Sequence, residues 1–270
     1  MKSKKSEGKL RTEPEKPKLK VGFYGITGCA GCLLSVVFNE DELLDVINKL
    51  DIKTFPFIKE KDTDEYLDVI FLEGVVASNH DLETLKKLRS KCNILVAMGA
   101  CATTGGVPTL RNFQNEENFT RLKYHKEKEI DDLQPKPVDS YVHVDYYIQG
   151  CPPDKKEILH IINDFVMGKK PYMYSKPVCV ECRKNKNPCL LEQGKPCLGP
   201  ITRGGCNAIC LNGGLMCWGC RGPADGTKEN FDIFIQMLKD KGHGEVFIHD
   251  RINTFQGWKF KEIQDAKETE

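Results

Sequence analysis

The chain has 270 residues, of which 40% are hydrophobic and 29% are charged, and its formal net charge at pH 7 is +1. This length allows one large domain, or one domain with a smaller module, around a buried core. The near-neutral charge argues against a nucleic-acid partner, because such proteins usually carry a basic face. The longest apolar stretches, such as residues 67–77, are too short to cross a bilayer and contain charge, so we expect no membrane span.

The first residues form a basic segment without an apolar run. Residues 1–20 carry eight Lys or Arg against three Glu. The segment has neither the apolar stretch of a secretory leader nor a pair of adjacent arginines. We therefore expect residues 1–19 to be a disordered basic tail, and we expect the protein to be cytoplasmic.

Between about residues 20 and 170, strand patterns alternate with helical patterns. Short apolar runs predict the strands, and apolar residues that recur every three or four positions predict the helices. Pro56 in the second strand pattern suggests a strand at the edge of the sheet. In chain order, the predicted elements are strand 19–26, helix 33–50, strand 52–58, strand 67–76, helix 80–92, strand 93–101, strand 141–150 and helix 152–168.

This alternation predicts an α/β fold with a parallel sheet that is covered by helices on both faces. Ligands of such sheets lie beyond the carboxyl ends of the strands. Four cysteines directly follow three of the predicted strands: Cys29, Cys32, Cys101 and Cys151. Three loops that converge on one edge of the sheet would form a pocket for a metal cluster.

Residues 171–225 differ from the preceding domain in composition. This segment holds eight of the thirteen cysteines, separated mainly by Pro, Gly, Asn and Lys. Because it offers little apolar surface to bury, we expect metal ligation to supply the missing stability. We therefore predict an α/β domain at 20–170, a small irregular cysteine-rich domain at 171–225, and a C-terminal helix with a polar tail at 226–270.

Twelve of the thirteen cysteines divide into three sets of four. A 4Fe–4S cluster is normally held by four cysteine thiolates, and a reducing compartment keeps thiols available for metal. The first set is Cys29, Cys32, Cys101 and Cys151, the second set is Cys179, Cys182, Cys189 and Cys197, and the third set is Cys206, Cys210, Cys217 and Cys220. Chain order suggests this division of the last eight, but it leaves a partly crossed pairing open.

Other chemistries remain open from the spacing alone. Zinc also takes four cysteines with Cys-x2-Cys spacing, so residues 179–220 could be a structural zinc module. A thioredoxin-like redox pair at Cys29 and Cys32 would leave the rest of the first set unexplained. The thirteenth cysteine, Cys92, lies at the end of a predicted helix and away from every motif, which favours a small buried apolar side chain.

Several residues near the motifs have two interpretations. Glu73 follows a buried apolar strand, where a structural carboxylate that caps a helix is favoured over a proton-relay or interface group. Asn207, Trp218 and Arg221 lie among the later cysteines, where they could pack or donate hydrogen bonds to cluster sulfur.

Together these motifs resemble the small, electron-transferring subunit of nickel–iron hydrogenases, from residue 20 to about residue 223. The motifs are TGCAGC (27–32), LEGVV (72–76), GAC (99–101), QGCPP (149–153), CLGPITRGGC (197–206) and CWGCRGP (217–223). The resemblance implies a flavodoxin-like first domain whose cysteines hold the cluster nearest the nickel–iron site. Cys179 stands where periplasmic members use His, and Cys210 adds a fourth ligand where they often hold a three-iron cluster. Three 4Fe–4S clusters are therefore implied.

The resemblance also implies partners. It is closest to cytoplasmic, multi-subunit hydrogenases of the non-deazaflavin-reducing, sulfhydrogenase delta or deazaflavin-reducing gamma type. Hydrogen would be split at the nickel–iron centre of a separate large subunit, so we assign no catalytic residue to this chain. Electrons would leave to a downstream flavin, deazaflavin or heterodisulfide-reductase subunit.

Three alternatives to a hydrogenase subunit remain at this point. The first is a stand-alone polycluster carrier that resembles a ferredoxin, for which a large α/β domain would be unnecessary. The second is a zinc-stabilised structural protein. The third is the related cluster-bearing subunit of respiratory or membrane-bound complexes, which lacks most of the cysteines found here at 179–220.

Overall fold

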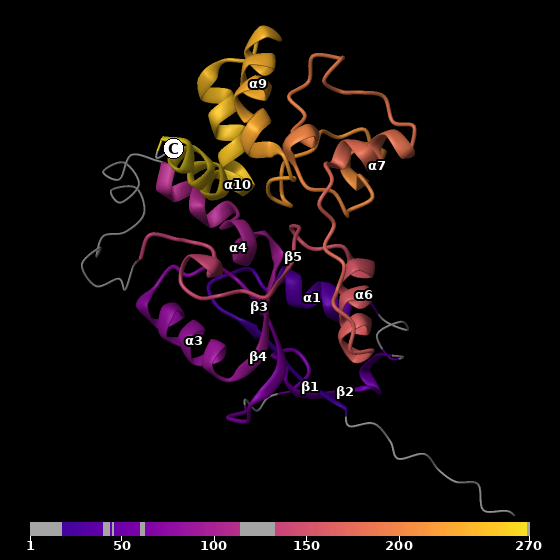
Figure 1. The fold of residues 1–270 in the computed structure, drawn as a ribbon, viewed down its shortest axis with the longest axis vertical. Helices are drawn as coiled ribbons and strands as arrows, with labels where there is room; N and C mark the ends of the chain where they lie inside the picture. Colours follow the sequence, from indigo (N-terminus) through magenta and orange to yellow (C-terminus); the bar gives the residue numbers. More distant parts are fainter. Residues whose placement is uncertain (1–17, 40–43, 45, 60–62, 114–132, 269–270) are drawn as a thin grey trace, which may run out of the picture.

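The computed structural model describes residues 18–39, 44, 46–59, 63–113 and 133–268. The sheet and its helices form one part of the molecule, and the cysteine-rich segment lies beyond one end of the sheet with the C-terminal helices (Figure 1). The predicted basic tail lies outside the described residues as far as residue 17. No helix within the described ranges is long and apolar enough to cross a membrane.

The sheet has five parallel strands in the order β2-β1-β3-β4-β5. The strands are β1 (Leu19–Gly25), β2 (Leu50–Thr54), β3 (Leu67–Glu73), β4 (Cys92–Met98) and β5 (Tyr146–Ile148). This order is the flavodoxin-like one, in which the winding reverses between β1 and β3 and ligands bind near that point. The predicted α/β class, the parallel sheet and the edge position of the second strand are confirmed.

Both faces of the sheet are buried. In β3, Val69 and Phe71 belong to one hydrophobic cluster, whereas Ile70 and Leu72 belong to another. Alternate side chains of a strand point to opposite faces, so a strand that is apolar at every position must be covered on both sides.

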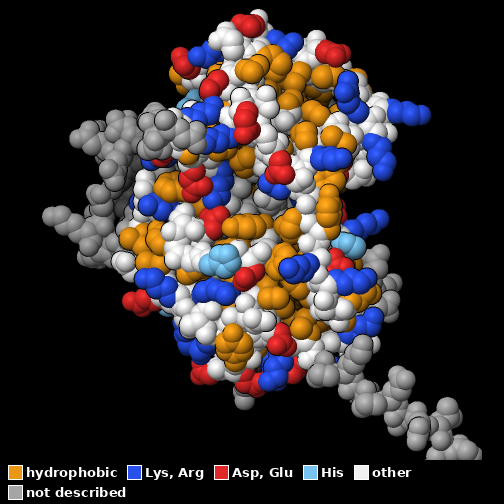
Figure 2. All heavy atoms as spheres, viewed as in Figure 1, with side chains coloured by type: hydrophobic (Ala, Val, Ile, Leu, Met, Phe, Trp, Pro, Cys, Tyr) orange, Lys and Arg blue, Asp and Glu red, His pale blue; other side chains and the backbone are white. Residues whose placement is uncertain are grey.

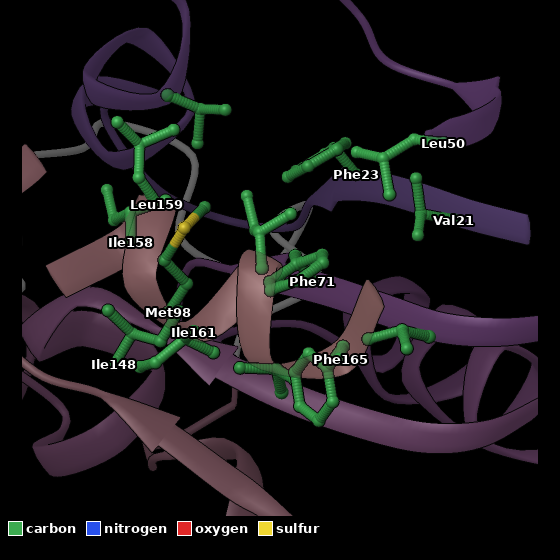
Figure 3. Close-up of a cluster of buried hydrophobic side chains, with 14 of the residues drawn as sticks. Val21, Phe23, Leu50, Phe71, Met98, Ile148, Ile158, Leu159, Ile161 and Phe165 are labelled. Atoms are coloured by element: carbon green, nitrogen blue, oxygen red, sulfur yellow. The ribbon is translucent and has the colours of Figure 1, made fainter. Parts of the chain in front are cut away.

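Helices provide this cover (Figure 1). On one face lie α1 (Gly31–Val37) and α6 (Lys155–Val166), where the ring of Phe165 meets that of Phe71 with centroids 6.3 Å apart (Figure 3). On the other face lies α3 (Asn79–Ser90). This packing fixes the carboxyl ends of β1 and β3 relative to each other.

The cysteine-rich segment and the C-terminal helices share one hydrophobic core. Their helices are α7 (Val178–Lys184), η4 (Gly199–Ile201), α8 (Ile209–Asn212), α9 (Thr227–Asp240) and α10 (Glu245–Glu268). Leu198 and Ile201 of the segment pack in one cluster with Phe234 of α9 and with Ile252 and Phe260 of α10. The segment thus gains apolar cover from α9 and α10 that its own composition does not provide.

Helix α10 also contacts the α/β part of the chain. It packs against α4 (Gly99–Thr104) and the short helix η1 (Val107–Phe113), and the hydroxyl of Thr104 donates to the carbonyl of Phe255 at 2.6 Å. The short helix η3 (Val138–Ser140) lies on α4 as well. One helix therefore touches both parts of the molecule.

Some predicted boundaries are wrong. The helix predicted at 33–50 is interrupted: α1 ends at Val37, residues 44 and 46–47 are helical again, and Leu50 already belongs to β2. The amide of Asn39 donates to the carbonyls of Ser35 and Val36, which satisfies the end of α1 and terminates it. Part of the predicted range lies outside the described residues.

Other differences affect the site more directly. The strand predicted at 141–150 is reduced to β5, since Asp145 accepts from the N–H of Leu95 and pairs with Arg89 at 3.1 Å. Cys101, expected on a loop, lies in the first turns of α4. The polar tail expected after the C-terminal helix is wrong, because Glu245–Glu268 form the long helix α10.

Candidate metal-cluster sites

The loop that carries Cys29 leaves β1 at the carboxyl edge of the sheet and is held by one buried carboxylate. Asp81, at the start of α3, accepts from the N–H of Thr27 at 3.2 Å and from its hydroxyl at 2.7 Å. It also accepts from the N–H groups of Ala77 and Ser78 and completes a capping box with Ser78. Asp81 therefore ties the loop after β1 to the loop after β3.

Glu73 ends β3 and is 3% exposed. Its carboxylate accepts from the backbone N–H of Leu33 at 3.0 Å, in the first turn of α1. A carboxylate in this position satisfies an N–H that has no partner inside the helix. The contact supports the helix-capping interpretation of Glu73.

The four thiols of the first set lie close together at this edge. Burial raises the pKa of Cys32 above its ordinary value, and neighbouring negative charges raise it further. Those neighbours are Glu73, Cys101, Cys151 and Cys29. Burial also raises the pKa of Cys101 to about 12, with Cys151 and Cys29 as the next causes. Two members of the set, Cys29 and Cys151, are exposed, so the site opens to the surface.

Glycine makes room for the sulfur atoms of this set. A Cβ atom placed on Gly99 would lie 2.2 Å from the sulfur of Cys32, and the φ angle of Gly99 is +87°. A side chain at this position would therefore collide with the thiol and strain the backbone.

The second set gathers around α7. Burial raises the pKa of Cys179 to about 12, and the neighbouring thiols raise it further. These neighbours are Cys197, Cys182 and Cys189. Cys182 and Cys197 are buried, whereas Cys189 is exposed. This set therefore also reaches the surface, at one of its members.

The third set lies around α8, with Cys210 inside the helix and the other three cysteines in the loops before and after it. Burial raises the pKa of Cys220 to about 11, and the thiols of Cys206 and Cys210 contribute to the rise. The pKa of Cys217 is raised by burial, and Cys197 and Cys220 add to it. Cys217 thus has neighbours in both the second and the third set, and the division of the later cysteines into two sets stays a prediction.

Hydrogen bonds connect the sets in a definite order. The backbone N–H of Cys151, in the first set, donates to the sulfur of Cys220, in the third set. The backbone N–H of Cys217, also in the third set, donates to the sulfur of Cys197, in the second set, at 3.4 Å. The third set therefore adjoins both of the others.

The surroundings of the sulfur atoms fit thiolate ligands of iron–sulfur clusters. The backbone N–H groups of Ala208 and Ile209 donate to Cys206, and that of Gly219 donates to Cys217. Such donors favour the thiolate over the thiol and tune the potential of a bound cluster. Within the described part of the chain, no group of three or more His, Cys, Asp or Glu side chains could hold a single metal ion.

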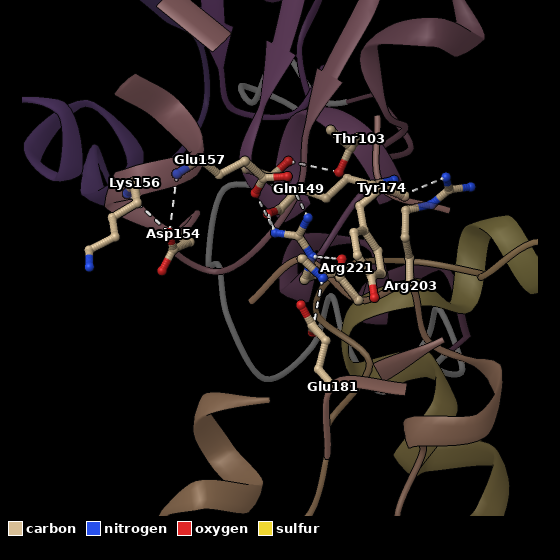
Figure 4. A network of polar contacts seen from close by, with 12 residues as sticks. Thr103, Gln149, Asp154, Lys156, Glu157, Tyr174, Glu181, Arg203 and Arg221 are labelled. Carbon is tan, nitrogen blue, oxygen red and sulfur yellow. Dashed lines mark hydrogen bonds and ion pairs between the residues drawn. The ribbon is translucent and has the colours of Figure 1, made fainter. Parts of the chain in front are cut away.

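A buried ion pair fastens the third set to the α/β part (Figure 4). Arg221 follows Cys220, is 2% exposed, and binds both carboxylate oxygens of Glu157 on α6 at 2.6 and 2.7 Å. It also donates to the carbonyls of Gly204 and Gln149. Burial alone would lower the pKa of Arg221. The hydrogen bonds and negative charge of Glu157, together with the thiols of Cys206 and Cys220, outweigh burial and raise that pKa.

The other residues singled out near the motifs also have partners. The guanidinium of Arg251 lies over the ring of Trp218, 3.4 Å from its centroid. The amide of Asn185 donates to the carbonyl and side-chain oxygens of Asn207. Cys92 is 3% exposed in the hydrophobic cluster under α3, as expected for a small buried side chain.

Comparison with known proteins gives the family. A family model described as "NADH ubiquinone oxidoreductase, 20 Kd subunit" matches residues 29–165. The "Sulfhydrogenase 2 subunit delta" of Pyrococcus furiosus is 37% identical over 243 residues, which cover 89% of this chain and 100% of that protein. The chain belongs to the small subunits of nickel–iron hydrogenases.

Two further comparisons agree with this family. A subunit of the F420-non-reducing hydrogenase of Methanocaldococcus jannaschii is 33% identical over 265 residues, covering 87% of this chain and 92% of that protein. One chain in the structure of an NAD+-reducing nickel–iron hydrogenase in the H2-reduced state has a TM-score of 0.53 and 27% identity. That match covers 58% of this chain and 96% of the other.

The extent of the matches distinguishes a hydrogenase small subunit from the related subunit of respiratory complexes. The family model named after a respiratory subunit covers only the α/β part, whereas the hydrogenase relatives span most of the chain. The prediction of a hydrogenase small subunit is confirmed over the respiratory alternative. This small subunit is the electron-transfer component of a nickel–iron hydrogenase complex, which is an oxidoreductase.

Sequence reasoning missed two features of this hydrogenase subunit. Asp81 could have been found, because Ser78 and Asp81 have the spacing of a capping box directly after the LEGVV motif. Arg251 and Gln256 of α10 lie against the loop between Cys217 and Cys220. They could not have been found from the sequence, because α10 itself was not predicted.

Proposed function

We propose that this small subunit holds three 4Fe–4S clusters and conducts electrons between the nickel–iron site of a large subunit and a downstream acceptor. The contacts between the sets carry this proposal. The N–H of Cys151 donates to Cys220, and that of Cys217 donates to Cys197. These contacts suit a path that runs from the first set through the third set to the second.

The clusters would supply one-electron redox chemistry, and the chain would hold them and set their potentials. The first set would hold the cluster nearest the large subunit, because Cys29 and Cys151 are exposed there. The third set would hold the middle cluster, and the second set the outermost. Four cysteines in every set favour 4Fe–4S clusters at all three positions. We assign hydrogen activation to the large subunit and none of it to residues of this chain.

The surface around the outermost set is basic. The exposed Cys189 is flanked in the chain by exposed basic side chains at Arg183, Lys184, Lys186 and Lys195, alongside one exposed carboxylate, Glu192. Figure 2 shows Lys and Arg side chains gathered at the edge of the molecule where α7 lies. We expect the acceptor to present an acidic surface here, since opposite charges speed encounter.

The acceptor class follows from the relatives. Their names describe sulfhydrogenase, F420-non-reducing and NAD-reducing hydrogenases. We propose a flavin, deazaflavin or heterodisulfide-reductase subunit as the downstream partner. A cytoplasmic complex is proposed too, because thirteen cysteines stay available for metal only in a reducing compartment.

Metal analysis tests the number and kind of clusters. The complex, purified anaerobically from its native host, should contain about twelve iron and twelve acid-labile sulfide atoms per small subunit, with nickel on the large subunit. Cys220→Ser should lower the iron content by about four or convert the middle cluster, because the third set loses a ligand. Cys92→Ala is the matched control and should leave the iron content unchanged.

Two results would contradict this assignment. About four iron atoms with zinc in place of the rest would make the later cysteines structural. A full set of iron without a nickel-bearing partner would favour the stand-alone carrier.

Charge reversal tests the exit surface. Lys184→Glu with Lys186→Glu should slow electron transfer to an acidic ferredoxin about tenfold at low salt, because electrostatic steering is lost. The difference in electron-transfer rate between this double variant and the wild type should shrink as ionic strength rises. The same double reversal on α3, at Lys86 and Lys87, is the control and should have no effect. Equal slowing with a small viologen dye would show damage to the clusters instead of a lost docking surface.

A further inference from the structure

Helix α10 places an arginine beside the CWGC loop of the third set (217–220). Arg251 is 4% exposed, donates to the carbonyl of Cys217 at 3.2 Å, and stacks over Trp218. Among the described residues, no carboxylate is within ion-pair distance of it. A guanidinium keeps its charge even when buried, so Arg251 brings an unneutralised positive charge to this loop.

A glutamine five positions further along α10 contacts the same loop. Gln256 is 0% exposed. A Cβ atom placed on Gly219 would lie 2.3 Å from its Nε2 atom, so the amide presses on the loop midway between Cys217 and Cys220. The left-handed φ angle of Gly219, +84°, and the lack of a side chain there permit this approach.

These two side chains carry polar atoms without partners. Within the described part of the chain, Nε of Arg251 and both amide atoms of Gln256 are buried and make no hydrogen bond. Buried donors normally have acceptors, because an unpaired donor loses its hydration without compensation. Two such side chains on one helix, both against the loop that carries two thiols of the third set, offer two free donors, Nε of Arg251 and Nε2 of Gln256, to a bound group that can accept from them. Oε1 of Gln256 is an acceptor and needs a donor instead.

We propose that Arg251 and Gln256 are positioning residues that set the potential of the cluster held by the third set. The inference rests on the proposed function, in which that cluster is the middle one. Reduction adds an electron to a buried site, and a nearby positive charge with N–H donors stabilises the more negative form. Helix α10, beyond the segment that carries the cysteine motifs, thereby becomes part of the electron path.

The location favours an effect on this cluster over the first one. Arg251 contacts Cys217 through its carbonyl, and the thiols of Cys217 and Cys197 are the charges that act on its guanidinium. These belong to the third and second sets. The first set has no such contact with Arg251 among the described residues.

Redox titration of the purified complex, followed by electron paramagnetic resonance, tests the inference. In Arg251→Met, the ratio of reduced to oxidised middle cluster at a fixed potential should be about tenfold lower. This corresponds to a reduction potential about 59 mV lower for a one-electron couple. Arg251→Lys, which keeps the positive charge, should have a ratio close to that of the wild type. Gln256→Leu should lower the ratio by a smaller factor. Lys261→Met, which removes an exposed charge from α10, is the control and should change nothing.

The outcomes separate the two proposals. A wild-type complex without three cluster signals would overturn the proposed function, and the inference with it. With three signals present, an unchanged middle potential in both Arg251→Met and Gln256→Leu overturns the inference alone. Loss of the middle cluster in Arg251→Met, with a normal potential in Gln256→Leu and Arg251→Lys, also overturns it, because Arg251 would then act only as a structural residue.

Discussion

Replacing Arg221 by Met is expected to destabilise the small subunit by about 3–5 kcal/mol, because it leaves the carboxylate of Glu157 buried without its partner. The guanidinium is 2% exposed and fills both oxygens of Glu157, while its remaining donors serve the carbonyls of Gly204 and Gln149. The contacts with Glu157 and Gln149 join the loop after Cys220 to the α/β part, whereas the contact with Gly204 lies within the cysteine-rich segment. Anaerobic calorimetry should show the unfolding midpoint lowered by roughly 10 °C.

Two further variants show whether the charge pair is responsible. Adding Glu157→Gln to Arg221→Met should recover much of the loss, because no charge then stays buried alone. Lys239→Met is the control for an exposed ion pair, since Lys239 pairs with the exposed Glu245, and it should cost at most about 1 kcal/mol. A double variant as unstable as Arg221→Met would show that the lost backbone hydrogen bonds dominate instead.

The fold could be predicted because its central strands are apolar on both faces. Every position of β3 from Val69 to Leu72 enters a hydrophobic cluster, which gives the continuous apolar run that is typical of a buried parallel strand. Pro56 suggested an edge strand because proline cannot donate to a neighbouring strand. The second strand is at the edge, although Pro56 lies just beyond the end of β2.

The spacing of the cysteines suggests a grouping, but it gives no order of the groups in space. The contacts from Cys151 to Cys220 and from Cys217 to Cys197 depend on how the cysteine-rich segment docks on the sheet. Docking is governed by Arg221, for which the sequence suggested packing or a bond to sulfur, and its partner Glu157 lies 64 positions away in the chain.

Helix α10 escaped prediction because its buried surface is partly polar. Arg251, Asn253 and Gln256 are each at most 5% exposed, so the buried positions do not form an apolar stripe. Two of these polar residues, Arg251 and Gln256, contact the loop of the third set. A departure from the expected pattern thus coincides with the place where we propose a functional role.

Replacing Asp81 by Ala should cost roughly 3–5 kcal/mol, because one carboxylate that is 5% exposed serves several donors at once. It accepts from the N–H and hydroxyl of Thr27 and from the N–H groups of Ala77 and Ser78. Without it, the loops after β1 and β3 lose their side-chain connection and keep only the backbone bond from Val75 to Thr27. The capping box of α3 loses the half that Asp81 supplies, whereas Ser78 still accepts from the N–H of residue 81. We expect a lower unfolding midpoint and faster loss of iron from the first set during anaerobic incubation.

Glu83→Ala is the matched control, because Glu83 is an exposed carboxylate on the same helix and its removal should stay within about 0.5 kcal/mol. The loss of stability in Asp81→Asn should fall between the losses in Asp81→Ala and Glu83→Ala. The amide keeps one acceptor oxygen but turns an NH2 group toward donors. If Asp81→Ala lowered stability but released iron from all three sets at the same rate, Asp81 would support the fold as a whole. Selective loss from the first set would show that the carboxylate holds the Cys29 loop in place, as its contact with Thr27 implies.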